Sequence, residues 1–142
     1  LKHGIIQDKD YFKELSEFKS LKTGEIENYI HHSVEIKNAV VTQDLYESNL
    51  RKILNFGHTL GHAIETHSLT QADKTNLLHG EAIAIGMITE AYLATLLSGL
   101  SKTAAEEIKS VFLKIYSIEN LFKKTSFQSE LFSDSLFRRT IN

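Results

Sequence analysis

Residues whose types and spacing suit chemistry are concentrated in one stretch, RKILNFGHTLGHAIE, from Arg51 to Glu65. Its polar side chains recur at intervals of 4, 3, 4 and 3 residues: Arg51, Asn55, His58, His62 and Glu65. On one continuous helix of about 3.6 residues per turn these intervals would place all five on one face. A solvated helix face usually carries Lys and Glu, so this stripe suggests a site rather than a surface.

The histidines indicate a metal site. His58 and His62 are one helical turn apart, which suits two ligands of one ion, although such pairs are more often structural. His79 opens a second apolar stretch, LLHGEAIAIG, at the expected N-terminus of a helix. The helix dipole there disfavours imidazolium, and a neutral imidazole is the form that binds metal. The residues leave two readings open: His79 joins His58 or His62 on one ion, or it only caps its helix.

A cationic clamp is the second candidate feature. Lys37 lies on the same helical stripe as Ile26, Ile30, Val34 and Val41, where a lysine either reaches to the surface or points into a polar cavity. Together with Arg51 it would bind a carboxylate or phosphate. We expect Lys37, Arg51, Asn55 and His62 to converge on one cavity beside the metal position.

The elements that position these residues are all predicted to be helices. Asp8 or Asp10 is expected to cap the first, Thr23 a second that runs to about Thr42, and Ser101 the last. The segment 80–98 is apolar on every side, which is typical of a central buried helix, and Gly99 should end it. Loops are expected at 43–49 and 66–76, and no segment alternates as a strand would. The sequence thus predicts an all-α helical bundle.

Composition limits the classes of function. The 142 residues carry a net charge of −2 and no cysteine, so nothing favours a nucleic-acid partner or a thiolate metal site. No apolar run approaches the ~20 residues that a membrane span needs, and no export signal is visible. We therefore expect a cytoplasmic protein with no membrane partner, forming a single domain over 1–142 with a divergent or truncated tail over 117–142.

The motifs together resemble a known family. LNFGHTLGHAIE followed by LHGEAIAIGM is similar to the signature of the 3-dehydroquinate synthases, and LKHGIIQD and EIKNAVVTQD resemble two further segments of that family. The resemblance implies the all-α C-terminal metal- and substrate-binding domain of a two-domain enzyme, whose N-terminal α/β domain binds NAD. The implied reaction is the second step of the shikimate pathway, a cyclisation of a phosphorylated seven-carbon sugar acid with loss of phosphate.

The resemblance also implies roles for single residues. By motif position His58 and His79 match metal ligands, for Zn or Co, and His62 and Glu47 match the groups that move protons. The matches to substrate-binding positions are Lys2, Lys37, Arg51 and Asn55. The family's third ligand, a glutamate, would lie two residues before Leu1, so we expect the isolated chain to bind metal weakly and to catalyse nothing. Glu65 would support a neighbouring histidine.

Departures from the family pattern leave other readings open. Ser48-Asn49-Leu50 stands where the family usually has glycines, but asparagine tolerates left-handed backbone better than most residues, so the turn can be kept. The alternatives are another sugar phosphate cyclase, which would share the metal and NAD, and a catalytically inactive helical domain. The full enzyme is expected to be a homodimer.

Overall fold

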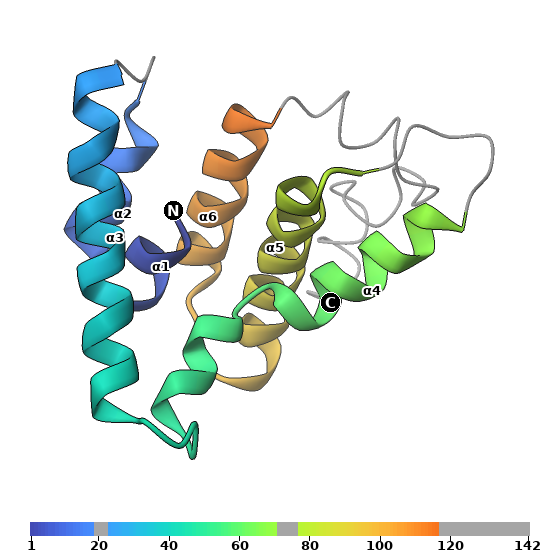
Figure 1. The fold of residues 1–142 in the computed structure, drawn as a ribbon. Coiled ribbons are helices and arrows are strands. Elements are labelled where there is room, and N and C mark those ends of the chain that lie inside the picture. The colour runs from blue at the N-terminus through green and yellow to red at the C-terminus, as the bar shows by residue number, and fades with distance from the viewer. Residues whose placement is uncertain (19–22, 71–76, 117–142) are drawn as a thin grey trace. The chain divides into compact units, whose positions relative to one another are not determined.

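Every regular element of the described residues is a helix. The structure is a computed structural model that describes residues 1–18, 23–70 and 77–116. The prediction of an all-α fold is confirmed for these residues, and the tail 117–142 lies outside them (Figure 1). The elements are α1 (Lys2–Gln7), α2 (Lys9–Ser16), α3 (Thr23–Gln43), the 3₁₀ helix η1 (Leu50–Asn55), α4 (His58–Leu69), α5 (His79–Leu97) and α6 (Lys102–Ile115).

The helices form two compact units, Leu1–Phe56 and Gly57–Asn142. The first contains α1, α2, α3 and η1, and the second contains α4, α5 and α6. Each unit is described by itself below. The single domain over 1–142 stays a prediction.

In the first unit, a buried tyrosine joins α2 to α3. Asp8 caps α2 by accepting a hydrogen bond from the backbone N–H of Tyr11 at 2.9 Å, as the sequence predicted. The Tyr11 side chain is buried, and its hydroxyl donates to the carbonyl of Tyr29 at 2.7 Å. Because a buried hydroxyl must be paired, this bond fixes where α2 meets α3.

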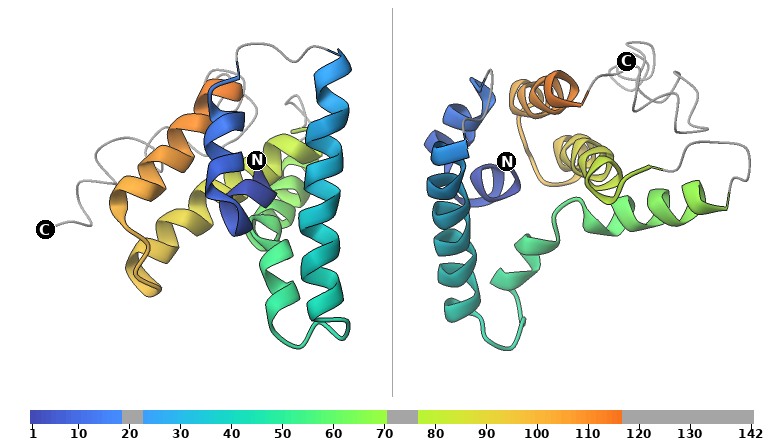
Figure 2. Two further views of the ribbon diagram at one scale, coloured as in Figure 1. Left: turned by 90° about the vertical axis from the view of Figure 1, so that its left-hand side faces the viewer. Right: turned by 45° about the horizontal axis from the view of Figure 1, so that its top comes forward.

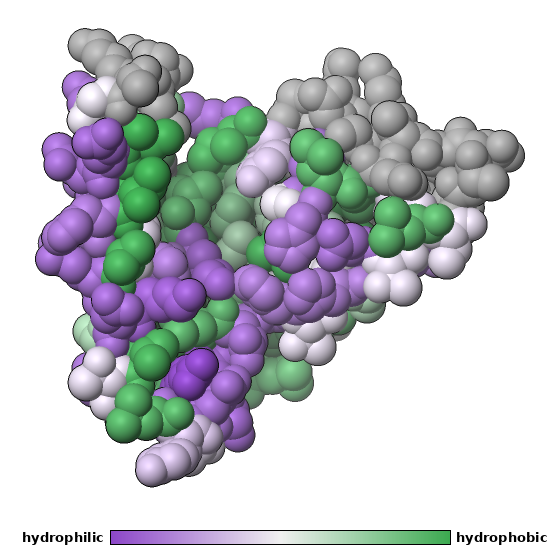
Figure 3. All heavy atoms as spheres, in the orientation of Figure 1, coloured by the Kyte–Doolittle hydropathy of each residue, from purple (hydrophilic) through white to green (hydrophobic). Residues whose placement is uncertain are grey.

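The apolar stripe of α3 stays at the surface of the described residues. Ile30 is 57% exposed and Val34 is 47% exposed, whereas Val40 on another face of the helix is buried. Hydrophobic side chains accordingly run along α3 in the space-filling view (Figure 3). Lys37, on the same stripe, is exposed too, so within the described chain it does not point into a closed cavity.

In the second unit, α5 is the central helix. It packs against both α4 and α6, and the two views of Figure 2 show it alongside each of them. Its residues are buried over about two turns, from Ala82 to Ile88, which confirms the expectation of a core helix. The described residues contain one helix, α5, that is long and apolar enough to cross a membrane. The sequence analysis expected no apolar run of that length. Half of the most apolar stretch of α5 is buried inside the structure.

Helix ends in the second unit follow the sequence signals. Gly99 has φ +78 and ends α5, and the N–H of Leu100 bonds back to the carbonyl of Ala94 at 3.1 Å. Ser101 caps α6, since its hydroxyl accepts from the N–H of Ala104 at 3.1 Å. Both predictions are confirmed.

The single helix predicted from Arg51 to Glu65 is wrong. Residues 50–55 form the 3₁₀ helix η1, and α4 begins only at His58. Gly57 between them has φ +79, a left-handed conformation that ends one helix and that only glycine adopts at no steric cost. The polar stripe is therefore divided, with Arg51 and Asn55 before the break. Helix α4 continues to Leu69, beyond residue 66, where the sequence predicted that a loop begins.

Candidate metal and substrate site

Glycines set the contact between the two histidine-bearing helices, α4 and α5. A Cβ on Gly86 would lie 2.1 Å from the carbonyl oxygen of Gly57 and 2.7 Å from the nitrogen of Gly61. Distances this short leave no room for a methyl group, so the backbones of α4 and α5 touch there. This contact fixes the N-terminal half of α4 against α5.

Three histidines meet at the ends of these helices. His58 and His62 stand one turn apart on α4 with ring centroids 5.6 Å apart, and His79 is the first residue of α5. The ring of His79 lies 6.3 Å from that of His58 and 5.5 Å from that of His62. The structure thus brings together all three histidines that the sequence singled out.

Glu65 joins two of the three. Both carboxylate oxygens of Glu65 lie 3.2 Å from Nδ1 of His79. Its Oε2 also lies 3.4 Å from Nδ1 of His62. Hydrogen bonds from His79 and then His62 lower the pKa of Glu65 below its ordinary value, so this carboxylate stays ionised. An ionised acceptor holds the proton of each imidazole on Nδ1 and leaves Nε2 for other chemistry.

Glu81, and not His79, makes the capping contact at the start of α5. The carboxylate of Glu81 accepts the backbone N–H of Leu78 at 2.8 Å, which satisfies the exposed donor at this helix end. The side chain of His79 is paired with Glu65 instead. His79 is therefore oriented by Glu65 and is not the side chain that caps this helix.

The donor set fits a borderline cation such as Zn²⁺ or Co²⁺. Imidazole nitrogens and a carboxylate oxygen are ligands of these ions, and the ligand atoms of His62, Glu65 and His79 lie within 4.8 Å of one another. In a tetrahedral site with bonds of ~2.0–2.1 Å, ligand atoms are ~3.3 Å apart. The separations of 3.2 and 3.4 Å from Glu65 to Nδ1 of His79 and His62 fit two arrangements. With the proton on Nδ1, Glu65 orients a ligand that binds through Nε2; with Nδ1 deprotonated, Glu65 and the imidazoles share one ion.

Glu47, Arg51 and Asn55 come together in the first unit. Oε1 of Glu47 accepts from the Asn55 amide at 3.2 Å, and Oε2 lies 3.9 Å from Nε of Arg51. Arg51 also donates to the carbonyl of Leu45 at 3.3 Å. The candidate proton acceptor thus lies between two candidate substrate-binding residues.

The backbone of Glu47 is left-handed, with φ +54. Asn49, which would tolerate this conformation, does not adopt it and has φ −153. A non-glycine residue at positive φ is uncommon and marks a position that its surroundings hold in place.

Asp44 organises this loop, and sequence reasoning missed it. It is only 8% exposed, and its carboxylate accepts the backbone N–H groups of Ser48 and Asn49 at 2.9 Å and of Arg51 at 3.0 Å. These bonds hold the pKa of Asp44 well below its usual range. An aspartate ahead of a polar loop was the available signal, since Asp favours bonding to nearby backbone N–H groups.

The two candidate lysines also lie near each other in the first unit. Lys2 donates from Nζ to the carbonyl of Leu54 at 2.8 Å, which ties α1 to η1. Burial, and then the positive charge of Lys37, lowers the pKa of Lys2. Two neighbouring ammonium groups favour an anionic ligand.

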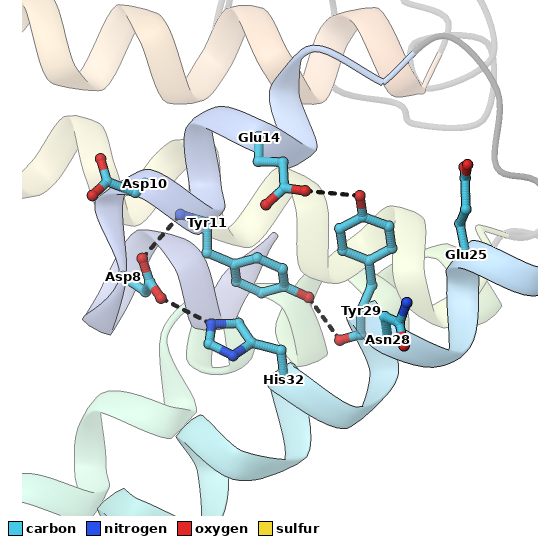
Figure 4. Close-up of a pocket in the computed structure, with 8 residues that line it drawn as sticks. All are labelled: Asp8, Asp10, Tyr11, Glu14, Glu25, Asn28, Tyr29 and His32. Carbon is cyan, nitrogen blue, oxygen red and sulfur yellow. Dashed lines mark hydrogen bonds and ion pairs between the residues drawn. The ribbon is translucent and has the colours of Figure 1, made fainter.

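A separate acidic pocket in the first unit contains none of the predicted site residues. Asp8, Asp10, Glu14 and Glu25 supply its carboxylates, and His32 closes one side (Figure 4). His32 lies 2.9 Å from Asp8 and edge-on to the ring of Tyr11. The contacts of His32 with Asp8 and Tyr11 join α2 to α3. None of the residues that line this pocket is a predicted site residue.

The predicted site residues therefore fall into two groups. Lys2, Lys37, Glu47, Arg51 and Asn55 belong to the first unit, and His58, His62 and His79 belong to the second. Each group is assembled within its unit. The convergence of Lys37, Arg51, Asn55 and His62 on one cavity stays a prediction.

A family model and three of the most similar relatives all point to one enzyme family. A family model described as "3-dehydroquinate synthase C-terminal" matches residues 1–135. A 3-dehydroquinate synthase of Thermodesulfovibrio yellowstonii is 45% identical over 115 residues, which are 78% of this chain and 31% of the relative. One of Streptococcus pyogenes is 45% identical over 113 residues, 79% of this chain and 30% of the relative. One of Sulfurovum is 40% identical over 114 residues, 80% of this chain and 31% of the relative. The chain thus spans less than a third of these relatives.

Proposed function

The chain belongs to the 3-dehydroquinate synthase C-terminal family, and we propose that it forms the metal- and substrate-binding part of a 3-dehydroquinate synthase. The observation that carries the proposal is the group of three histidines at the starts of α4 and α5, two of them paired with Glu65. Relatives that carry this enzyme's name match most of the chain, which favours it over another sugar phosphate cyclase.

We propose His58 and His79 as the metal ligands, with Glu65 orienting His79 through Nδ1. When bound, NAD takes up and returns a hydride, and the metal polarises the hydroxyl group that is oxidised. An N-terminal α/β domain would bind most of the NAD. The full enzyme would act in the cytoplasm as a homodimer.

The chain's own residues would bind the substrate and move its protons. Lys2, Lys37 and Arg51 would hold its carboxylate and phosphate, and Asn55 a hydroxyl group. His62 would exchange a proton at Nε2, because Nδ1 faces Glu65. Glu47 would accept a second proton, at a position fixed by Arg51 and Asn55.

The test of the reaction is a chimera. The matched region of the Thermodesulfovibrio relative is replaced by this chain, and NAD-dependent phosphate release from the phosphorylated sugar acid is measured. We expect turnover by the chimera and a loss of ~10²–10⁴-fold in its His62→Ala variant. A folded chimera that releases no phosphate would exclude the function.

The metal ligands are tested by titrating the chain alone with Zn²⁺ in a calorimeter. We expect weak binding that is lost in His58→Ala and His79→Ala and kept in His62→Ala. Loss in His62→Ala together with retention in His58→Ala would instead make His62, Glu65 and His79 the ligand set. His67→Ala, in the last turn of α4, is the control.

A further inference from the structure

The residue just before helix α4 has no side chain with which to cap it. A helix leaves its first backbone N–H groups without partners inside the helix, and an N-cap side chain usually accepts one of them. The N-cap of α4 is Gly57, which has no side chain. The residue that follows, His58, is a proposed metal ligand, so the shape of this first turn decides where its imidazole points.

Glycine is required at position 57 by two independent features. Its φ of +79 is strained for any L side chain, and a Cβ would lie 2.2 Å from Cγ of Met87 and 3.0 Å from the carbonyl oxygen of Ile83. Ser, Thr, Asp and Asn, the residues that normally cap a helix, are therefore excluded. A side-chain cap for α4 can therefore come only from another part of the chain.

Glu90 of α5 supplies it. Its Oε2 accepts the backbone N–H of Gly57 at 2.7 Å, and its Oε1 accepts that of Leu60 at 3.4 Å. Gly57 and Leu60 are the N-cap and the third helical residue of α4, so one carboxylate spans the first turn. Its negative charge also lies at the positive end of the helix dipole.

We propose that Glu90 is a positioning residue, which caps α4 from the neighbouring helix and thereby fixes the orientation of His58. The proposal rests on the proposed function for the metal that His58 would bind. The bonds of Glu90 and the glycine contact lie on the same pair of helices and act together. The glycines set the distance between α4 and α5, and Glu90 sets the geometry of the turn that carries the imidazole.

The test uses the ¹⁵N-labelled chain and the variants Glu90→Ala and Glu90→Gln. Glu107→Ala, at an exposed position of α6, is the matched control. The measurements are amide hydrogen exchange, the imidazole ¹⁵N signals of His58 and His67, and the affinity for Zn²⁺. Loss of a helix cap should speed exchange at Gly57 and Leu60 about fivefold or more relative to the middle of α5.

In Glu90→Ala we expect the signals of His58 to shift, those of His67 to stay, and Zn²⁺ to bind about tenfold more weakly. Glu90→Gln should retain part of the effect, because its carbonyl oxygen can accept one of the two bonds. It also replaces Glu90→Ala if that variant fails to fold. Unchanged exchange at Gly57 and unchanged His58 signals would overturn the proposal.

These readouts separate the two hypotheses. If the parent chain does not bind Zn²⁺ at all, the proposed metal site fails, but the exchange and imidazole signals still decide whether Glu90 positions His58. If Zn²⁺ binds and Glu90→Ala leaves both the affinity and the signals unchanged, the metal site stands and the role of Glu90 is refuted.

Discussion

Gly57→Ala should be among the most destabilising single-methyl changes in the chain. Holding alanine at φ +79 costs about 1–2 kcal/mol. The new methyl group would lie 2.2 Å from Cγ of Met87 and 2.9 Å from its backbone nitrogen, and such overpacking typically costs about 1–3 kcal/mol. The lower entropy of alanine in the unfolded chain offsets about 0.4–1 kcal/mol. We expect a net loss of about 2–4 kcal/mol, measured by urea unfolding followed by circular dichroism.

Two other glycines separate these contributions. Gly99 has φ +78 with nothing within 4 Å of its Cβ position, so Gly99→Ala carries only the backbone cost, about 1 kcal/mol or less. Gly24 lies in α3 with open space around it, and Gly24→Ala should stabilise by about 0.5–1 kcal/mol. A Gly57→Ala variant no less stable than Gly99→Ala would show that α4 and α5 do not pack backbone to backbone.

The other predictions concern charge and substrate binding. Asp44→Asn should lower the urea midpoint at pH 7, and the gap from the parent should narrow as the pH falls below 3.8, because a depressed pKa contributes stability only while the carboxylate is ionised. The pKa of His32 is raised by its bonds to Asp8 and then Glu35, so its contribution is complete below pH 6.5 and disappears as the pH rises through the raised value. His32→Gln should therefore destabilise at pH 5.5 and do much less at pH 9. In the chimera, Arg51→Lys should raise the KM about tenfold, because lysine lacks the planar two-point contact with a carboxylate.

Each of these variants has a matched control. Glu107→Gln changes an exposed carboxylate, His67→Gln an exposed histidine and Lys52→Arg an exposed cation next to Arg51. A gap between Asp44→Asn and the parent that stays constant with pH would contradict the loop argument. Equal effects of His32→Gln at both pH values would contradict the ion pair, and an unchanged KM in Arg51→Lys would count against the clamp.

Much of the fold could be predicted because its signals are local. Asp8 and Ser101 cap helices through bonds three residues away, and Gly99 ends α5 through its own backbone conformation. Local signals also grouped the histidines, since His58 and His62 are neighbours on any helix. His79 could be added because a helix that is apolar on all sides must pack against others.

The errors arose where distant parts of the chain decide the local shape. The spacing from Arg51 to Glu65 fits one helix, but Gly57 breaks it because its backbone packs against Met87, thirty residues later in the sequence. Glu90 could not be recognised as a cap for the same reason, since its partner Gly57 lies on another helix. Propensity pointed to Asn49 as the residue most tolerant of left-handed backbone, whereas in the loop held by Asp44 the left-handed residue is Glu47.

Because Asp44 anchors the loop between α3 and η1, it determines which substitutions the loop can accept. One carboxylate accepts the backbone N–H groups of Ser48, Asn49 and Arg51 and also the hydroxyl of Ser48, so Asp44 is the main determinant of the loop's conformation. Leu45 and Tyr46 are 64% and 93% exposed, so packing constrains them little. Substitutions at Ser48 and Asn49 that keep the aspartate should therefore leave Arg51 in place. Loss of the aspartate should accordingly disturb the loop far more than changes of the residues that it holds.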